Sequence, residues 1–129
     1  MDDKYIYIVA GDEMKKIMEI NFPNRKIIPF REDFSKGKIT SEVLDNNLIS
    51  ERTKFWGVLE TEYIKNISPI LNLDLDENYI LCFGEDDCCK ANLTFMINYL
   101  KRKKYSKQIK VQIVDEYTLE IKKEYLVEI

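Results

Sequence analysis

Histidine is missing from the 129 residues of this chain. Without an imidazole, the chain can form neither a Ser-His-Asp nor a Cys-His catalytic group, and a histidine-based metal site is excluded. No run approaches the ~18 apolar residues that span a bilayer. The start of the chain also lacks the basic region and long apolar run of a signal peptide. We therefore expect a cytoplasmic protein that does not enter a membrane.

Cysteine is scarce, and its three copies are Cys82, Cys88 and Cys89. Adjacent cysteines rarely pair, and an odd count leaves one thiol over. There is no CxxC motif and no second cluster that could complete a zinc shell, so we expect no structural metal site. We predict three free thiols in a reducing compartment. Cys88, near the start of an expected helix, should be the most reactive of them.

The composition is that of one ordinary globular domain, which we place at residues 1–129. The sequence is 45% hydrophobic and 33% charged, which argues against disorder. A chain of this length has room for one hydrophobic core. The net charge of −3 weighs against a general nucleic-acid binder, which needs a basic surface.

Short apolar runs rich in β-forming residues predict strands at residues 5–10, 26–30 and 78–83. Pro29 cannot donate to a strand ladder, so we place the second strand at a sheet edge. Apolar residues at helical spacing predict the intervening helices, which start near Asp12, Ser41, Ser50 and Asp86. The helix from Ser50 would place four side chains in the core, namely Phe55, Leu59, Tyr63 and Ile67.

From Ile109 onward, apolar residues fall on odd positions and most even positions are polar. This alternation predicts a half-exposed fourth strand, followed by a hairpin-like extension with a turn near residues 122–124. The whole pattern predicts an α/β fold: a Rossmann-like three-layer sandwich with a mostly parallel sheet of four to five strands. We expect the strand order 2-1-3-4, with an antiparallel C-terminal edge strand.

Charged residues follow each of the first three expected strands. Ligands of open α/β sheets bind outside the carboxyl ends of the strands, where the strand order reverses. The candidate binding residues at that edge are Asp12, Arg31, Glu32, Arg52 and Asp86. The acids could hold a divalent cation or act as a general base, and Arg31 could bind an anion. Without a ligand, Asp12 and Asp86 need a countercharge, which we expect from Arg31 or from Arg52. Arg52 could serve only if the first turn of its helix caps the shared pocket. The alternative is that Asp12 and Asp86 only cap the helices that follow them.

The same segments resemble, in their order and spacing, the bacterial family called domain of unknown function 1835. The residues that carry the resemblance are Gly11-Asp12, Arg31-Glu32, Gly37, Arg52, Phe55-Trp56, Phe83, Asp86, Cys89, Asn92 and Leu93. The resemblance covers about residues 5–100 and implies site positions but no reaction. The sequence departs from the family pattern, which has serine, proline, tryptophan and glutamine, at Glu13, Lys38, Cys82 and Lys90.

Two functional hypotheses follow. The first is a domain that binds a small ligand (an anion, a nucleotide-like molecule or a metal-assisted ligand) at the charged edge, with or without catalysis. Neither GxGxxG nor GxxxxGK[ST] is present, so no nucleotide motif supports it. The second is a non-catalytic interaction or regulatory module that pairs through the C-terminal sheet edge, which we expect to form a homodimer. The sequence leaves the cofactor, if there is one, unknown.

Overall fold

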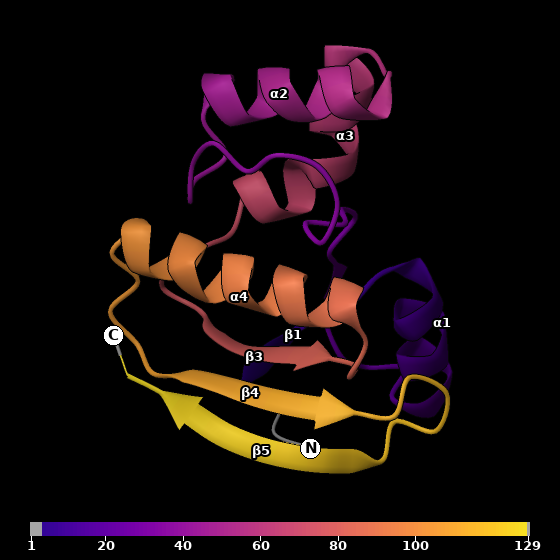
Figure 1. Ribbon diagram of the computed structural model, residues 1–129. Coiled ribbons are helices and arrows are strands. Elements are labelled where there is room, and N and C mark those ends of the chain that lie inside the picture. The colour runs from indigo at the N-terminus through magenta and orange to yellow at the C-terminus, as the bar shows by residue number, and fades with distance from the viewer. Residues whose placement is uncertain (1–3, 129) are drawn as a thin grey trace.

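The computed structural model describes residues 4–128, which form one sheet with helices on both faces (Figure 1). In chain order the elements are β1 (Tyr5–Val9), α1 (Asp12–Asn21), β2 (Ile27–Pro29), α2 (Asn46–Trp56), α3 (Glu60–Leu71), β3 (Asn78–Phe83), α4 (Asp87–Arg102), β4 (Ile109–Val114) and β5 (Ile121–Val127). The strand order is β2-β1-β3-β4-β5. All neighbours are parallel except the antiparallel pair β4–β5. The predicted mostly parallel α/β fold and its antiparallel C-terminal edge strand are therefore confirmed.

The two faces of the sheet carry separate apolar cores. Helix α1 packs Met14 and Met18 against one face, where they meet side chains of β1, β3 and β4. On the other face α2, α3 and α4 bury a larger cluster (Figure 1). Buried strands with both faces covered explain the near-continuous apolar runs of β1 and β3. Among residues 4–128 no helix is both long and apolar enough to cross a membrane.

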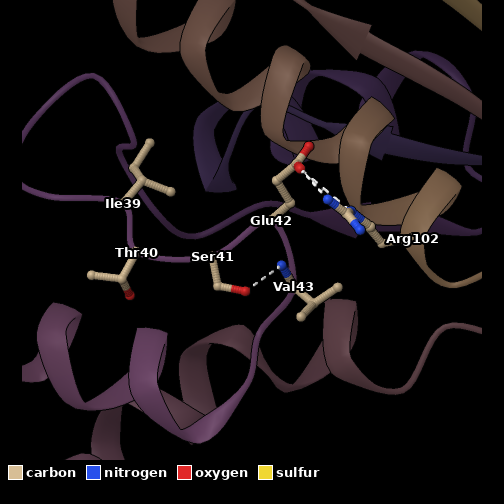
Figure 2. A pocket seen from close by; sticks show the side chains of 6 residues that line it. All are labelled: Ile39, Thr40, Ser41, Glu42, Val43 and Arg102. Atoms are coloured by element: carbon tan, nitrogen blue, oxygen red, sulfur yellow. Dashed lines mark hydrogen bonds and ion pairs between the residues drawn. The ribbon is translucent and has the colours of Figure 1, made fainter.

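The long segment between β2 and α2 contacts α4 near the C-terminal end of that helix. Arg102, in the last turn of α4, donates from Nη2 to Glu42 Oε1 at 2.9 Å (Figure 2). The two side chains stand at an exposed hollow that also contains residues 39–43. A basic residue at this position also complements the negative end of the helix dipole. Arg102 therefore has a structural role that needs no ligand.

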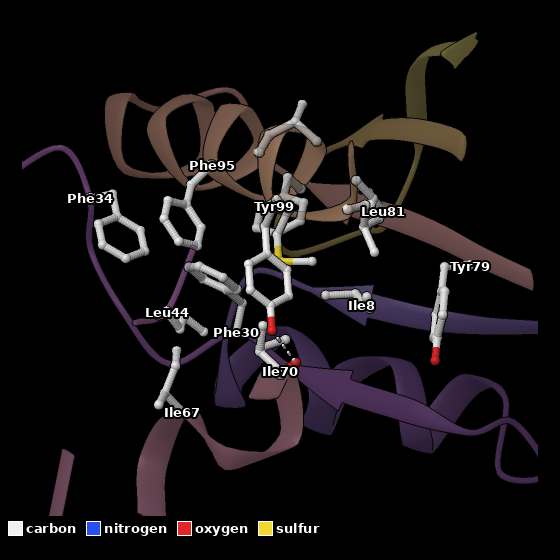
Figure 3. Close-up of a cluster of buried hydrophobic side chains, with 14 of the residues drawn as sticks. Ile8, Phe30, Phe34, Leu44, Ile67, Ile70, Tyr79, Leu81, Phe95 and Tyr99 are labelled. Carbon is white, nitrogen blue, oxygen red and sulfur yellow. Dashed lines mark hydrogen bonds between the residues drawn. The ribbon is translucent and has the colours of Figure 1, made fainter. Parts of the chain in front are cut away.

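Aromatic rings form the centre of the larger core (Figure 3). Phe34 and Phe95 stack with ring centroids 4.0 Å apart, and Phe30 lies within 6.2 Å of both. Tyr99 stacks on Phe95 and donates its hydroxyl to Ile70 O. Phe30 and Phe34 lie in the segment that follows β2. Their burial therefore draws that segment, with its charged residues, across the carboxyl end of the sheet.

Three predicted boundaries are wrong. No helix begins near Ser41, because α2 begins only at Asn46, after Asp45 caps it by accepting from Leu48 N. The helix expected from Ser50 is two helices, because Gly57 adopts a left-handed conformation (φ 66°) that ends α2. The turn breaks the predicted apolar face, so that Leu59 is 72% exposed and Phe55 is half-exposed. The hairpin turn expected near residues 122–124 lies earlier. Asp115 accepts from the backbone amides of residues 117 and 118 there, and β5 is a continuous strand.

Candidate functional site

A cleft of about 370 Å³ lies at the carboxyl ends of β1, β3 and β4. The first turns of α1 and α4 and the β4–β5 turn surround it, and all three lie on one side of the molecule in Figure 1. We call it the rim cleft, and its lining includes Asp12, Glu13, Asp86, Cys88 and Glu116. The strand order reverses between β1 and β3, so the cleft is where an open α/β sheet binds ligands.

Asp86 and Glu116 form a carboxyl pair in the rim cleft. Asp86 caps α4 as predicted, because its Oδ1 accepts from the Cys89 backbone amide at 2.7 Å. That hydrogen bond, and a further one to Glu116, hold the pKa of Asp86 below its ordinary value. The hydrogen bond to Asp86, together with burial, raises the pKa of Glu116. Glu116 therefore binds a proton more tightly than a free glutamate does.

Cys89 completes a group that could hold a metal ion. One donor atom from each of Asp86, Cys89 and Glu116 lies within 4.8 Å of the others. The Cys89 thiol contacts Glu116 Oε1 at 3.5 Å. Burial and the neighbouring carboxylates raise the pKa of Cys89 well above its ordinary value. Because a thiol coordinates metals as the thiolate, this group favours oxygen ligation by the two carboxyls over ligation by sulfur.

Glu116 is the rim residue that sequence reasoning missed. We expected strand or extension at its position, whereas it belongs to the β4–β5 turn. Gly84, directly after β3, allows the approach, because a Cβ at that position would collide with the Glu116 carboxyl. Gly84 was visible in the sequence, but its partner was not, since nothing in the sequence placed the turn at residues 115–119.

Asp12 and Arg31 form an ion pair at the edge of the rim cleft. Arg31 Nε donates to both carboxylate oxygens of Asp12, at 3.1 and 3.2 Å. Both side chains are at least one-third exposed, so the pair contributes little to stability. The predicted cap by Asp12 is wrong, because Gly11 occupies the N-cap position of α1 and no described side chain accepts from its first turn. The carboxylate of Asp12 faces Arg31 instead.

Glu32 and Arg52 form a buried ion pair away from the rim cleft. Arg52 Nε and Nη2 donate to the two carboxylate oxygens of Glu32, both at 2.9 Å. Their side chains are 1% and 0% exposed. Tyr63 Oη and Trp56 Nε1 also donate to Glu32. Burial raises the pKa of Glu32, but the hydrogen bonds from Arg52 and Tyr63 outweigh burial and leave this pKa below its ordinary value.

The remaining donors of Arg52 hold the segment that follows β2. Nη2 donates to Asp33 O at 2.8 Å, and Nη1 donates to Lys36 O at 2.7 Å. Gly37, at φ 77°, lies so close that a Cβ there would be 2.9 Å from Nη1. From the other side, buried Asn92 accepts from Phe34 N at 2.9 Å and donates to Glu32 O at 2.7 Å. Arg52, Gly37 and Asn92 therefore fix this segment.

The five predicted site residues thus divide into three places. Asp12 and Asp86 line the same cleft, as expected. Arg31 pairs with Asp12, one of the two acids for which we expected a countercharge. Arg52 does not reach Asp12 or Asp86, because Glu32 and three backbone carbonyls use its donors. The expectation that Arg52 caps a shared pocket is wrong, since Arg52 and Glu32 bind one another in the interior.

The cysteines are free thiols, as predicted, and Cys88 is the least buried of the three. Burial and a hydrogen bond to Asp33 raise the pKa of Cys88 to about 12. The nearby carboxylates of Asp86 and Glu116 act in the same direction. The helix N-terminus at this position would lower the pKa, but the carboxylates and burial outweigh it.

Comparison with known proteins gives no relative. No family model, no curated protein and no solved structure matches the chain. The function must therefore be argued from the geometry of the site.

Proposed function

We propose that this chain is a small-ligand-binding domain whose site is the rim cleft, and that its ligand carries positive charge. The observation that carries the proposal is the Asp86–Glu116 carboxyl pair, which faces a cleft at the reversal of strand order. No lysine or arginine is among the described residues that line the cleft. A cation bound between Asp86 and Glu116, whose donor atoms lie within 4.8 Å of one another, would relieve the repulsion between the two carboxylates.

A hard divalent cation is the simplest ligand of this kind. Carboxylate oxygens suit magnesium, calcium and manganese, whereas zinc would favour a thiolate that the raised Cys89 pKa opposes. One oxygen of Asp86 is engaged by the cap of α4, so Asp86 would offer its other oxygen beside those of Glu116. Asp12 and Glu13 line the same cleft and could bind water molecules of the ion's hydration shell.

The test is a thermal-shift series with magnesium, calcium and manganese chlorides at constant ionic strength. A ligand that binds only the folded state raises the melting temperature by mass action. The variant Glu116→Gln should abolish the shift. Glu120→Gln, an exposed acid of the same turn that lies outside the cleft lining, should retain it. A shift that survives in Glu116→Gln, or no shift with any of the three ions, contradicts the proposal.

The second candidate function is self-association through β5. Among the described residues no strand lies beyond β5, and Ile121 and Leu126 on it are more than half exposed. An exposed edge strand is a template for pairing. An antiparallel copy centred on Tyr125 would place Lys122 opposite Glu128, twice across the two-fold axis. This complementarity favours a homodimer with one continuous sheet over pairing with an unrelated strand.

Sedimentation at micromolar concentration tests the homodimer. The variant Lys122→Glu should shift the protein toward monomer, and the charge swap Lys122→Glu with Glu128→Lys should restore the dimer. Wild-type protein that is monomeric at these concentrations contradicts the candidate, as does a dimer that both variants leave unchanged.

The sequence also suggests the origin and the family of the protein. We infer a Rossmann-like, bacterial, cytoplasmic protein related to the domain of unknown function 1835. What supports the relationship is that residues far apart in the sequence which carry the resemblance contact one another, as Glu32 does Arg52 and Asn92. Nucleic acid is not a favoured partner, because the chain has a net charge of −3.

A further inference from the structure

A second hollow, of about 360 Å³, adjoins the corner between α2 and α3. We call it the corner pocket, and its lining includes Arg31, Trp56, Val58 and Asn66. It is separate from the rim cleft, although the Arg31–Asp12 ion pair joins the two linings. Apolar walls with a few polar groups are typical of pockets for small organic ligands.

One wall of the corner pocket is a fixed aromatic ring. Trp56 is 40% exposed, yet its indole Nε1 donates to the buried Glu32 carboxylate at 2.8 Å. Glu32 is itself held by Arg52 and Tyr63. Val58, also more than one-third exposed, adds an aliphatic surface to the lining. A planar ring placed against Trp56 would bury apolar area without requiring the protein to rearrange.

The charged group of the pocket is Arg31. Both of its hydrogen bonds to Asp12 use Nε, and within residues 4–128 neither Nη1 nor Nη2 donates to a protein atom. The planar guanidinium can therefore offer two parallel N–H groups to a carboxylate. Glu32 does not oppose an anion, because Arg52 neutralises it. Asp33 is the opposing acid, and its Oδ1 is already engaged by Ser35 N and Oγ.

We propose that the corner pocket binds a small planar aromatic carboxylate. The carboxylate would bind the terminal nitrogens of Arg31, and the ring would lie between Trp56 and Val58. The exposed amide of Asn66 would meet a polar substituent on the ring. This inference is independent of the proposed cation in the rim cleft, because the pocket requires neither Asp86 nor Glu116.

The chain contains a single tryptophan, which is Trp56, so its fluorescence reports on this pocket alone. Titration with benzoate should give a saturable change in emission. Benzamide, which lacks the charge, and cyclohexanecarboxylate, which lacks the aromatic ring, should each bind at least tenfold more weakly. A change that is linear in benzoate up to the highest concentration indicates collisional quenching only and overturns the proposal, as does equal binding of benzamide.

Two arginine variants localise the binding. Arg31→Met should weaken benzoate binding at least tenfold. Arg102→Met is the matched control, because Arg102 also forms an exposed pair with one acid, Glu42, and should leave binding unchanged (Figure 2). Equal binding by Arg31→Met and wild type overturns the proposal. Glu116→Gln should bind benzoate like wild type, so failure of the rim-cleft proposal and failure of this one give different results.

Discussion

Replacing Arg52 by alanine should remove a large part of the stability of the fold. The guanidinium is completely buried and makes five hydrogen bonds, two to Glu32 and three to the carbonyls of Asp33, Lys36 and Lys38. The substitution leaves the Glu32 carboxylate buried without its countercharge. Breaking a buried pair in this way costs about 3–5 kcal/mol. A domain of this size has a total stability of roughly 5–15 kcal/mol.

Urea unfolding followed by circular dichroism measures this loss as a change in midpoint. Arg31→Ala is the matched comparison, because it removes an arginine from an exposed pair and should cost less than about 1 kcal/mol. Arg52→Lys serves if the alanine variant does not fold. Lysine keeps the charge but loses the fork that holds both oxygens of Glu32, so it should also be clearly less stable than wild type.

The double variant Glu32→Leu with Arg52→Met tests whether the stabilisation comes from the interaction between the two charges. Because it removes both charges, its loss of unfolding free energy should be smaller than the sum of the losses in Glu32→Leu and Arg52→Met measured singly. If Arg52→Ala instead costs under about 1 kcal/mol, the guanidinium is solvated in the native protein. The inference that this pair holds the segment after β2 would then be refuted.

Three smaller predictions follow from the titratable groups. Although burial raises the pKa of Glu32, hydrogen bonds from Arg52 and Tyr63 hold this pKa below its ordinary value. The stabilisation from the ionised carboxylate is therefore complete above the pKa of glutamate in the unfolded chain. This stabilisation should be lost as the pH falls through the pKa of Glu32 in the folded protein. Acid unfolding curves should therefore show a larger loss of stability in wild type than in Glu32→Gln. The pKa of Glu116 is raised, so its ionisation on raising the pH disfavours the folded state. Glu116→Gln should therefore raise the melting temperature at pH 7, and the gain should shrink toward pH 4. Thiol titration should give three free thiols after unfolding. In native protein Cys88 should react before Cys82 and Cys89, but slowly, because its pKa is about 12.

The order of the strands could be predicted because each step depends on local patterns with one topological solution. Three apolar runs joined by helices require right-handed crossovers and a parallel sheet. Pro29 correctly placed β2 at an edge. The change to alternation after Ile109 correctly indicated an antiparallel partner at the other edge. These signals depend on residues within one element or beside it.

Two of the wrong boundaries share a physical cause. The spacing from Phe55 to Tyr63 fits one helix, and only the left-handed conformation of Gly57 interrupts it. In the same way, the Asp115 carboxylate stabilises its turn by accepting from the backbone amides of residues 117 and 118. Side-chain periodicity shows no trace of such hydrogen bonds. Patterns of hydropathy do not show where a turn is formed by hydrogen bonds to backbone amides. Glu116 was missed for this reason, since its position depends on that turn.

The position of the candidate site could be predicted from the sequence, but the role of each of its residues could not. Each role depends on which hydrogen-bond donors and acceptors are already used within the fold. Arg52 and Asn92 direct their polar groups to the segment after β2 and to buried neighbours, so substituting them tests folding. Arg31 retains two terminal nitrogens, and Glu116 lies beside the carboxyl group of Asp86, where one cation could bind both. Ligand binding requires groups whose bonding capacity is not exhausted within the protein. Function should therefore be sought first at Arg31 and Glu116.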